Sequence, residues 1–229
     1  MQLSVIIPCL NEAAEIGTTL KACRIAIGYD AEIVVVDGGS CDETVDIARQ
    51  AADVVLFAPR GRASQMNAGS RRARGEVLLF LHADSRLPAD AASLVLDGLA
   101  QTSKRWGRFD VAISGKHLFF PVIGAFMNAR SRLTSVATGD QALFVTRTLF
   151  ARVGGFPEMP LMEDIALSSS LAKVSSPLCL RERVITSGRR WEKHGVLRTI
   201  LLMWRLRLAY WRGVSPLELA RLYATHREP

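Results

Sequence analysis

The chain begins with four short apolar runs that alternate with longer segments of helical spacing. The runs consist mostly of Val, Ile, Leu and Phe, as in strands that are buried on both faces of a sheet. The segments between them repeat apolar residues every three or four positions, which is typical of amphipathic helices. The pattern predicts strands at 3–9, 32–37, 54–57 and 76–81, and helices at 13–27, 43–51, 63–73 and 89–100.

The second half of the chain is less regular. It predicts strands at 109–118 and 142–146, helices at 121–137 and 162–174, and a loop at 154–157. Strands that alternate with helices form a parallel sheet through right-handed crossovers. We therefore expect residues 1–180 to form one α/β domain, with a doubly wound, mainly parallel sheet and helices on both faces.

The positive charge is concentrated in a tail. Residues 181–229 contain 11 Lys and Arg against 4 Asp and Glu, whereas residues 1–180 contain 18 of each, so the tail accounts for the whole net charge of +7. A basic tail on a neutral body indicates an anionic partner. Nucleic acid, an anionic membrane surface and a phosphorylated substrate are the candidates.

The tail contains a strongly apolar segment at 196–212 that we expect to be an amphipathic helix. Four arginines interrupt it, so it does not resemble a membrane span. At about 100° per residue, Arg198, Arg205 and Arg212 share one side, Arg207 lies opposite, and Trp204 and Trp211 share a flank. Such a helix lies in a membrane interface or packs on the rest of the chain or on a second copy, as in a homodimer.

Composition narrows the class of protein. The 229 residues are 49% hydrophobic and 22% charged, which excludes a disordered chain, a collagen and a disulfide scaffold. The four cysteines form no CxxC pair, and no basic segment precedes the first apolar run as in a signal peptide. We expect a cytoplasmic protein, and a peripheral position on the inner face of the cell membrane is the open alternative.

Polar residues follow each of the first four strands. Ligands of open parallel sheets bind at the carboxyl ends of strands, so these segments are the first place to look for a site. They are Pro8-Cys9-Leu10-Asn11-Glu12, Asp37-Gly38-Gly39-Ser40-Cys41-Asp42, Arg60-Gly61-Arg62 and His82-Ala83-Asp84-Ser85. GxGxxG does not follow the first strand and GxxxxGK[ST] does not occur, which argues against a dehydrogenase and a P-loop ATPase.

Four motifs in order resemble a known family. SVIIPCLNEAAEI, VVVDGGSCDET, LLFLHADSRLP and LMEDIAL look like the inverting family 2 glycosyltransferases of the GT-A fold. The match is closest to a short bacterial subgroup with an HAD[ST] motif. The resemblance covers roughly residues 3–175, and residues 187–222 also look like that subgroup's tail. It implies a nucleoside diphosphate sugar as donor, usually linked to uridine or guanosine, and a divalent metal ion.

The resemblance assigns donor contacts to the first three strand ends. Pro8 and Asn11 belong to the first loop, Glu12 is the candidate for the ribose hydroxyls, and Asp37 is the candidate for the base edge. The family usually has DDGS where this chain has DGGS, so the second acid is missing. The alternatives are a helix cap for Glu12 and a turn residue for Asp37.

Arg62 is expected to reach the base or the diphosphate. Asn67 is expected to bind donor, or else to cap or pack.

The HAD motif stands where many relatives carry DxD, which holds Mg²⁺ or Mn²⁺ on the diphosphate. Asp84 is the expected metal ligand, since hard oxygen ligands suit these ions. We expect His82 to contact the sugar or a water molecule. Ala83, the next residue, is expected to line the same donor site. His194 is an open alternative as a further ligand. The plain alternative for Asp84 is a turn residue.

The ED motif is expected to supply the base that deprotonates the acceptor hydroxyl. We assign this role to Asp164 and a supporting role to Glu163. The alternative is that both carboxylates only stabilise a helix N-terminus. Asp140 and Gln141 are expected to face the donor sugar or the acceptor, and Arg189 and Arg190 to fold over the diphosphate.

The sequence thus predicts a metal-dependent glycosyltransferase with a basic helical tail and an unknown acceptor, possibly lipid-linked. A nucleotidyltransferase is disfavoured, because its first loop is usually rich in Gly and basic residues and here it is PCLNEAAE. A non-catalytic nucleotide-binding module would not need Asp84, Glu163 and Asp164. A nucleic-acid-binding role finds no known motif to support it.

Overall fold

A computed structural model describes residues 2–225, apart from the side chains of Arg190, His194 and Thr225. Within them an eight-stranded sheet has the order β3-β2-β1-β4-β7-β6-β8-β5. The strands are β1 (Leu3–Cys9), β2 (Glu32–Asp37), β3 (Val54–Phe57), β4 (Val77–Phe80), β5 (Ser85–Arg86), β6 (Trp106–Ser114), β7 (Phe144–Thr146) and β8 (Leu178–Ser187).

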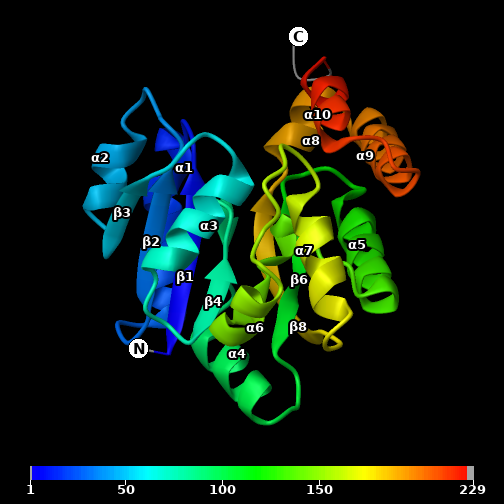
Figure 1. The fold of residues 1–229 in the computed structure, drawn as a ribbon. Coiled ribbons are helices and arrows are strands. Elements are labelled where there is room, and N and C mark those ends of the chain that lie inside the picture. The colour runs from blue at the N-terminus through cyan, green and yellow to red at the C-terminus, as the bar shows by residue number, and fades with distance from the viewer. Residues whose placement is uncertain (1, 226–229) are drawn as a thin grey trace.

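The helices connect and cover these strands (Figure 1). They are α1 (Ala13–Ile27), α2 (Thr44–Arg49), α3 (Arg62–Arg72), α4 (Ala91–Ala100), α5 (Phe120–Thr134), the 3₁₀ turn η1 (Gly139–Gln141), α6 (Arg147–Arg152), α7 (Glu163–Ala172), α8 (Arg189–His194), α9 (Val196–Trp211) and α10 (Pro216–Thr225).

The first four helix-linked strands pair in parallel, and the later strands extend the sheet in mixed directions. β1 lies between β2 and β4, and β3 pairs with β2, all in parallel. β7 runs antiparallel to both β4 and β6, β8 runs parallel to β6, and β5 runs antiparallel to β8. The α/β fold with a mostly parallel sheet is therefore confirmed.

Successive side chains of each strand point to opposite faces of the sheet, and both faces are buried. In β1, Leu3, Val5 and Ile7 belong to one core cluster, and the intervening Ile6 belongs to another. The first cluster includes residues of α1 and α4, such as Leu20 and Val95, and the second includes residues of α3, α6 and α7. Figure 1 shows α3, α6 and α7 in front of the sheet. Continuous apolar strands are thus needed because each strand meets helices on both sides.

The C-terminal helices lie above the carboxyl ends of the parallel strands in Figure 1. Val196 of α9 joins a small core with α5 and β6, and Leu206 of α9 packs with Leu219 of α10 and Met162. Among the described residues, no helix combines the length and the apolar character that crossing a membrane requires.

Several details differ from the sequence-based expectation. β6 spans Trp106–Ser114, not 109–118, and α6 and α10 were not predicted. β8 was also missed, because the exposed Arg181, Glu182 and Arg183 interrupt its apolar pattern. The expected boundary at residue 180 falls inside β8, so the sheet continues to Ser187. A division into a catalytic domain and a tail stays a prediction.

The close approach of α3 to the sheet generates a stability prediction. A Cβ atom on Gly69 would lie 2.5 Å from Ile6 Cγ2 and 2.9 Å from Val36 Cγ2, both within the packed core. We expect Gly69→Ala to reduce the free energy of unfolding by about 1–3 kcal/mol, because overpacking exceeds the gain in helix propensity. Urea denaturation measures it.

Gly17→Ala in α1 is the matched control. Its Cβ would lie 3.1 Å from the end of the Ile47 side chain alone, so the gain in helix propensity should keep its stability near or above that of the wild type. Equal stabilities of the two variants would show that α3 is not held this close.

Candidate functional site

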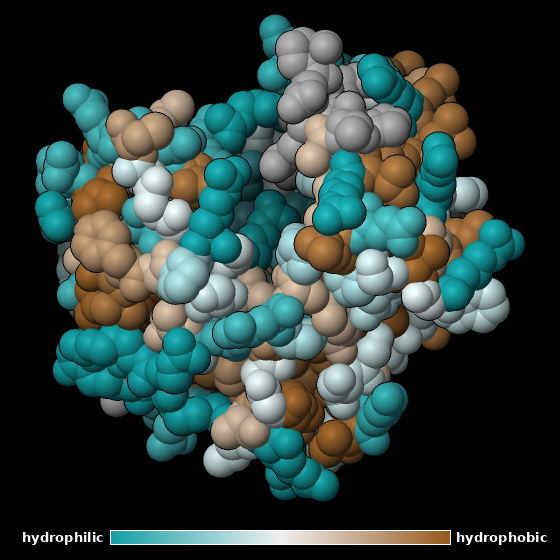
Figure 2. Space-filling view, turned by 45° about the horizontal axis from the view of Figure 1, so that its top comes forward, coloured by the Kyte–Doolittle hydropathy of each residue, from teal (hydrophilic) through white to brown (hydrophobic). Residues whose placement is uncertain are grey.

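A cavity of about 950 Å³ opens at the carboxyl ends of β1 and β4 and extends between α5 and α9. Figure 2 shows the hollow with hydrophilic side chains on its walls. Of the residues predicted for the site, nine line the cavity: Pro8, Glu12, Arg62, His82, Ala83, Asp84, Asp140, Glu163 and Arg189. The side chain of Arg190 lies outside the described residues. The topology thus brings together segments that are far apart in the sequence.

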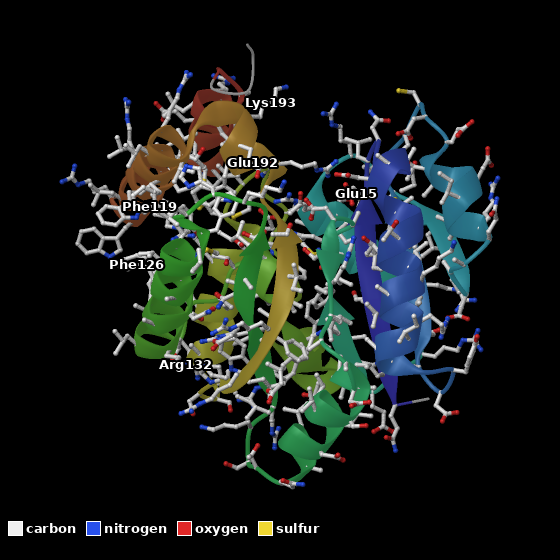
Figure 3. All side chains as sticks on the ribbon, turned by 180° about the vertical axis from the view of Figure 1, so that it is seen from behind. Glu15, Phe119, Phe126, Arg132, Glu192 and Lys193 are labelled. Atoms are coloured by element: carbon white, nitrogen blue, oxygen red, sulfur yellow. The ribbon has the colours of Figure 1, made fainter. Side chains whose placement is uncertain are left out.

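Arg189 connects α8 to the opposite side of the cavity. Its guanidinium lies 3.2 Å from Glu12 Oε2, 3.6 Å from Glu15 Oε1 and 3.8 Å from Asp84 Oδ2. Desolvation lowers the pKa of Arg189, but the hydrogen bond to Glu12 and the three carboxylates raise it overall. In Figure 3, the labels of Glu15 in α1 and Glu192 in α8 show the two sides of the cavity that Arg189 connects. The site therefore places a cation where three carboxylates meet.

Glu12 is available to a ligand, unlike a helix-capping residue. It occupies the N-cap position of α1, yet its side chain makes no capping hydrogen bond. The first turn of α1 is instead served by Asp42, whose Oδ2 accepts a hydrogen bond from the backbone N–H of Ala13 at 3.2 Å. The Glu12 carboxylate faces the cavity and accepts a hydrogen bond from Arg189. The cap interpretation of Glu12 is therefore wrong.

Asp37 stabilises the turn after β2, as the alternative interpretation of this residue predicts. Its carboxylate is fully buried and accepts hydrogen bonds from the backbone N–H groups of Gly39 and Ser40 at 2.8 and 2.9 Å. The Ser40 hydroxyl donates to its other oxygen at 2.5 Å. The predicted contact to a nucleotide base stays a prediction; in this structure the loop itself uses both oxygens, and Asp37 does not line the cavity among the described residues.

Three further predicted residues hold loops behind the cavity and do not line it. The Asn11 carboxamide oxygen accepts a hydrogen bond from the Cys41 backbone at 2.9 Å. The Asn67 side chain exchanges hydrogen bonds of 2.8 and 3.0 Å with the backbone of Phe156, so it fixes the loop before α7. Gln141 is fully buried beside Asn128. These side chains position loops in this structure, and their predicted contacts to donor or acceptor stay predictions.

Among the described residues, Asp84 has too few protein ligands beside it to hold a divalent ion without a bound molecule. These residues contain no group of three or more His, Cys, Asp or Glu side chains that could hold a metal ion. Asp84 follows β4, and its side chain is 27% exposed in the cavity, next to the cationic group of Arg189. It would hold Mg²⁺ or Mn²⁺ together with oxygens of a bound diphosphate and water. The His194 side chain lies outside the described residues.

His82 packs on the turn that carries Asp140. Its Nδ1 lies 3.4 Å from Asp140 Oδ1. A Cβ atom on Gly139 would lie 2.3 Å from His82 Nε2, so only glycine fits between the ring and the turn. His82 therefore fixes the position of η1 within the cavity wall, in addition to any contact with a sugar.

The carboxylates of Glu163 and Asp164 differ in what they face. Glu163 is buried, 5% exposed, and lines the cavity. Asp164 accepts hydrogen bonds from the backbone N–H groups of Gly139 and Ile165, both at 2.7 Å, and does not line the cavity among the described residues. Glu163 is therefore the member of the pair that the structure presents to a ligand.

The electrostatics of Glu163 favour proton transfer. Burial raises its pKa, the charge of Asp164 raises it further, and the guanidinium of Arg62 opposes both. Arg62 is itself desolvated, which lowers its pKa, but Glu163, Asp140 and Asp164 raise it overall. A carboxylate with a raised pKa titrates nearer to neutral pH, as a general base should.

Sequence reasoning missed several residues of the cavity. Gln65 donates hydrogen bonds of 2.8 Å from Nε2 to the carbonyl groups of Cys9 and Val36, so it ties α3 to the ends of β1 and β2. Arg207 lines the cavity from α9. Cys9 also lines it, and burial together with Asp37 raises the pKa of its thiol to about 12. The only signal for Gln65 was its place in the RASQMNAG segment.

The cavity has an apolar half that the strand ends do not supply. α5 contributes Val122, Ile123, Phe126 and Met127, and α9 contributes Ile200, Met203 and Trp204. The rings of Phe126 and Trp204 stack with centroids 5.9 Å apart. The site therefore suits a ligand that is charged at one end and apolar at the other.

Comparisons with known proteins agree with this geometry. The family model described as glycosyl transferase family 2 matches residues 4–152. A "PGL/p-HBAD biosynthesis glycosyltransferase" of Mycobacterium bovis is 30% identical over 89% of this chain and 97% of its own length. An "Undecaprenyl-phosphate 4-deoxy-4-formamido-L-arabinose transferase" of Pectobacterium carotovorum is 34% identical over 43% of this chain and 34% of its own length.

Solved structures share the fold at low sequence identity. A mannosyltransferase from Pyrobaculum calidifontis in complex with GDP-Man and Mn²⁺ superposes with a TM-score of 0.65 and 22% identity, over 91% of this chain and 61% of that chain. S. aureus TarS 1-349 in complex with UDP-GlcNAc gives 0.65 and 18%, over 82% and 58%. This chain thus spans about three fifths of each of these solved chains.

The coupling within the carboxylate pair generates a titration prediction. We expect Asp164→Asn to shift the titration of Glu163 to lower pH, because it removes the neighbouring negative charge that raises the pKa of Glu163. Carbon-13 NMR of the Glu163 carboxyl measures the shift. Asp46→Asn, in the exposed face of α2, should leave that titration unchanged. A shift to higher pH in Asp164→Asn would contradict the prediction.

Proposed function

The chain belongs to glycosyl transferase family 2, and we propose that it transfers a sugar from a nucleoside diphosphate sugar to an acceptor hydroxyl, with inversion and with the help of a divalent metal ion. One observation supports this most: a single cavity joins the carboxylate and arginine cluster at the strand ends to the buried Glu163. Inversion follows from the resemblance of the four motifs to inverting enzymes.

The strand-end side of the cavity is the proposed donor site. Glu12 accepts hydrogen bonds from the ribose hydroxyls in place of Arg189, and Arg189 then turns to the diphosphate. Arg62 adds positive charge near the sugar. The base edge is proposed to meet the segment Pro8–Leu10, which lines the cavity, while the buried Asp37 lies behind it at the end of β2.

A metal ion would be held by Asp84, together with the donor's diphosphate and water. When bound, Mg²⁺ or Mn²⁺ would offset the negative charge that develops on the leaving diphosphate. Arg189 of α8 supplies further positive charge. Without donor it contacts the carboxylates of Glu12 and Asp84, and with donor bound it would contact the diphosphate, so its position responds to donor binding.

The base is proposed to come from the Glu163–Asp164 pair. The sequence assigns it to Asp164, whereas the geometry favours Glu163, which lines the cavity and has the raised pKa. In this arrangement Glu163 accepts the proton as the acceptor oxygen attacks the anomeric carbon. Asp164 raises the basicity of Glu163 and anchors the turn at Gly139.

The acceptor is proposed to be amphiphilic and lipid-linked. The apolar half of the cavity between α5 and α9 offers room for a non-polar group next to the reacting hydroxyl. The name of the Pectobacterium relative, which contains undecaprenyl phosphate, agrees with this class of acceptor.

The metal assignment is tested by Asp84→Ala. We expect this variant to keep its fold and to lose the extra thermal stabilisation that Mn²⁺ gives to donor binding, since ligand binding stabilises the native state. Thermal shift against a panel of uridine and guanosine diphosphate sugars, with and without Mn²⁺, measures it and also identifies the base. Asp46→Ala is the control. An unchanged Mn²⁺ effect in Asp84→Ala would remove Asp84 from the metal site.

The base is tested by two isosteric variants. Glu163→Gln cannot accept a proton and should lower kcat by roughly 10²-fold or more, with donor binding nearly normal. Asp164→Asn should lower kcat less and move the acidic limb of the pH profile to lower pH. Steady-state kinetics with release of nucleoside diphosphate as readout compares them.

Two outcomes would contradict the proposal. A large loss in Asp164→Asn with a small one in Glu163→Gln would return the base to Asp164, as the sequence predicts. Release of pyrophosphate in place of nucleoside diphosphate would identify a nucleotidyltransferase.

A further inference from the structure

We propose that α9 and α5 form a surface that docks this enzyme on an anionic lipid bilayer, with the cavity opening toward the lipid. This surface, called the outer apolar face, consists of Phe119, Val122, Phe126, Leu197, Leu201, Trp204, Leu208 and Trp211. The inference goes beyond the transfer reaction, because it concerns where the reaction takes place.

The side of α9 that faces solvent is more apolar than the fold requires. Its inner side is buried through Val196, Thr199 and Leu206. The five apolar residues of α9 in the outer apolar face nevertheless recur at helical spacing, within an arc of about 80°. They are exposed by 72% at Leu197, 68% at Leu201, 56% at Trp204, 48% at Leu208 and 83% at Trp211. A soluble helix would carry polar residues at these positions.

α5 continues this face without a break. Phe119, Val122 and Phe126 are 53%, 63% and 52% exposed, and Phe126 stacks on Trp204 of α9. Figure 3 shows Phe119 and Phe126 at the outer edge of the molecule, where α5 meets α9. Figure 2 shows hydrophobic side chains gathered over this part of the molecule, with hydrophilic ones beside them. Two helices thus present one contiguous apolar surface.

Arginines border the outer apolar face on both sides along α9. At about 100° per residue, Arg198, Arg205 and Arg212 lie along one border of the apolar stripe and Arg207 lies along the other. The helix from Val196 to Trp211 contains no acidic residue. Apolar side chains that enter the acyl region, with flanking arginines at the headgroups, are the pattern of an interfacial helix.

The charge distribution favours a bilayer over a second copy of the chain. In a two-fold symmetric interface the same surface meets itself, so the arginine rows of the two copies would be brought together. Anionic headgroups are complementary to those rows, and each basic residue near such a surface strengthens binding about fivefold. The occupant that fits both the apolar stripe and its borders is an anionic membrane.

The outer apolar face and the cavity share residues. Val122, Phe126 and Trp204 belong to the face and also line the cavity. An enzyme docked by this face therefore opens its apolar half toward the bilayer. An acceptor that is anchored in the membrane would reach Glu163 without leaving the lipid phase.

Vesicle flotation tests the inference. We expect the full chain to float with vesicles of phosphatidylcholine and phosphatidylglycerol at low salt, and much less with phosphatidylcholine alone. The variant Leu201→Ser/Leu208→Ser/Trp211→Ser, which changes residues outside the cavity lining, should reduce recovery at least tenfold. Arg198→Gln/Arg205→Gln/Arg212→Gln should reduce it by a similar factor and remove its salt dependence.

The matched control is Ile25→Ser/Tyr29→Ser. These residues are 85% and 88% exposed but lie at the end of α1, outside the outer apolar face, so recovery should not change. Equal recovery of the control and the Leu201 triple variant would overturn the inference. So would failure of the wild type to float with either lipid.

Light scattering tests the alternative that the outer apolar face binds a second copy of the chain. A wild-type dimer that the Leu201 triple variant converts to a monomer, without flotation, would show that the face joins two copies and would overturn docking on lipid. Donor-dependent thermal shifts should be the same in the wild type and the triple variants. Failure of the wild type to float, with its donor-dependent thermal shifts intact, would therefore count against membrane docking alone, and not against the proposed transfer reaction.

Discussion

The parallel pairing of β1 with β2 and β4 is the constraint on which the site depends. It places the segments that follow these strands at one edge of the sheet, with Glu12 after β1 and Asp84 after β4. Helices must then cover both faces, because every crossover returns the chain to the same end. The polar residues at that edge are free to bind a ligand since the core does not need them.

The half of the sheet with mixed strand directions brings further residues to the cavity wall. β7 reverses direction between β4 and β6, and the turn before β7 carries Gly139 and Asp140 to the cavity wall. The N-terminus of α7 brings Glu163 to the same place. β8 then leads into α8, whose Arg189 reaches back to the N-terminal half. The cavity wall is therefore assembled from both halves of the chain.

The sequence predicted the parallel half well because its signals are local. Apolar runs such as LSVIIPC and EIVVVD indicate strands that are buried on both sides, and the structure confirms both within a residue. β8 could not be predicted in this way, because three consecutive exposed charged residues interrupt its apolar pattern. Nine of the residues that the motif resemblance predicts for the site line the cavity. The sequence did not indicate that loops use the side chains of Asp37, Asn11, Asn67 and Gln141, since the type of a polar residue does not show which partner its hydrogen bonds have.

The buried Cys9 gives the site an unexpected chemical property. It is the thiolate, not the thiol, that reacts with alkylating agents and oxidants. With its pKa raised to about 12, Cys9 stays protonated throughout the physiological range, although it borders the cavity. Cys41 is exposed, and among the described residues it is the cysteine most open to reagents. Peroxide or a maleimide would thus react with Cys41 before Cys9, so the protein has a cysteine in the wall of its cavity that resists oxidation.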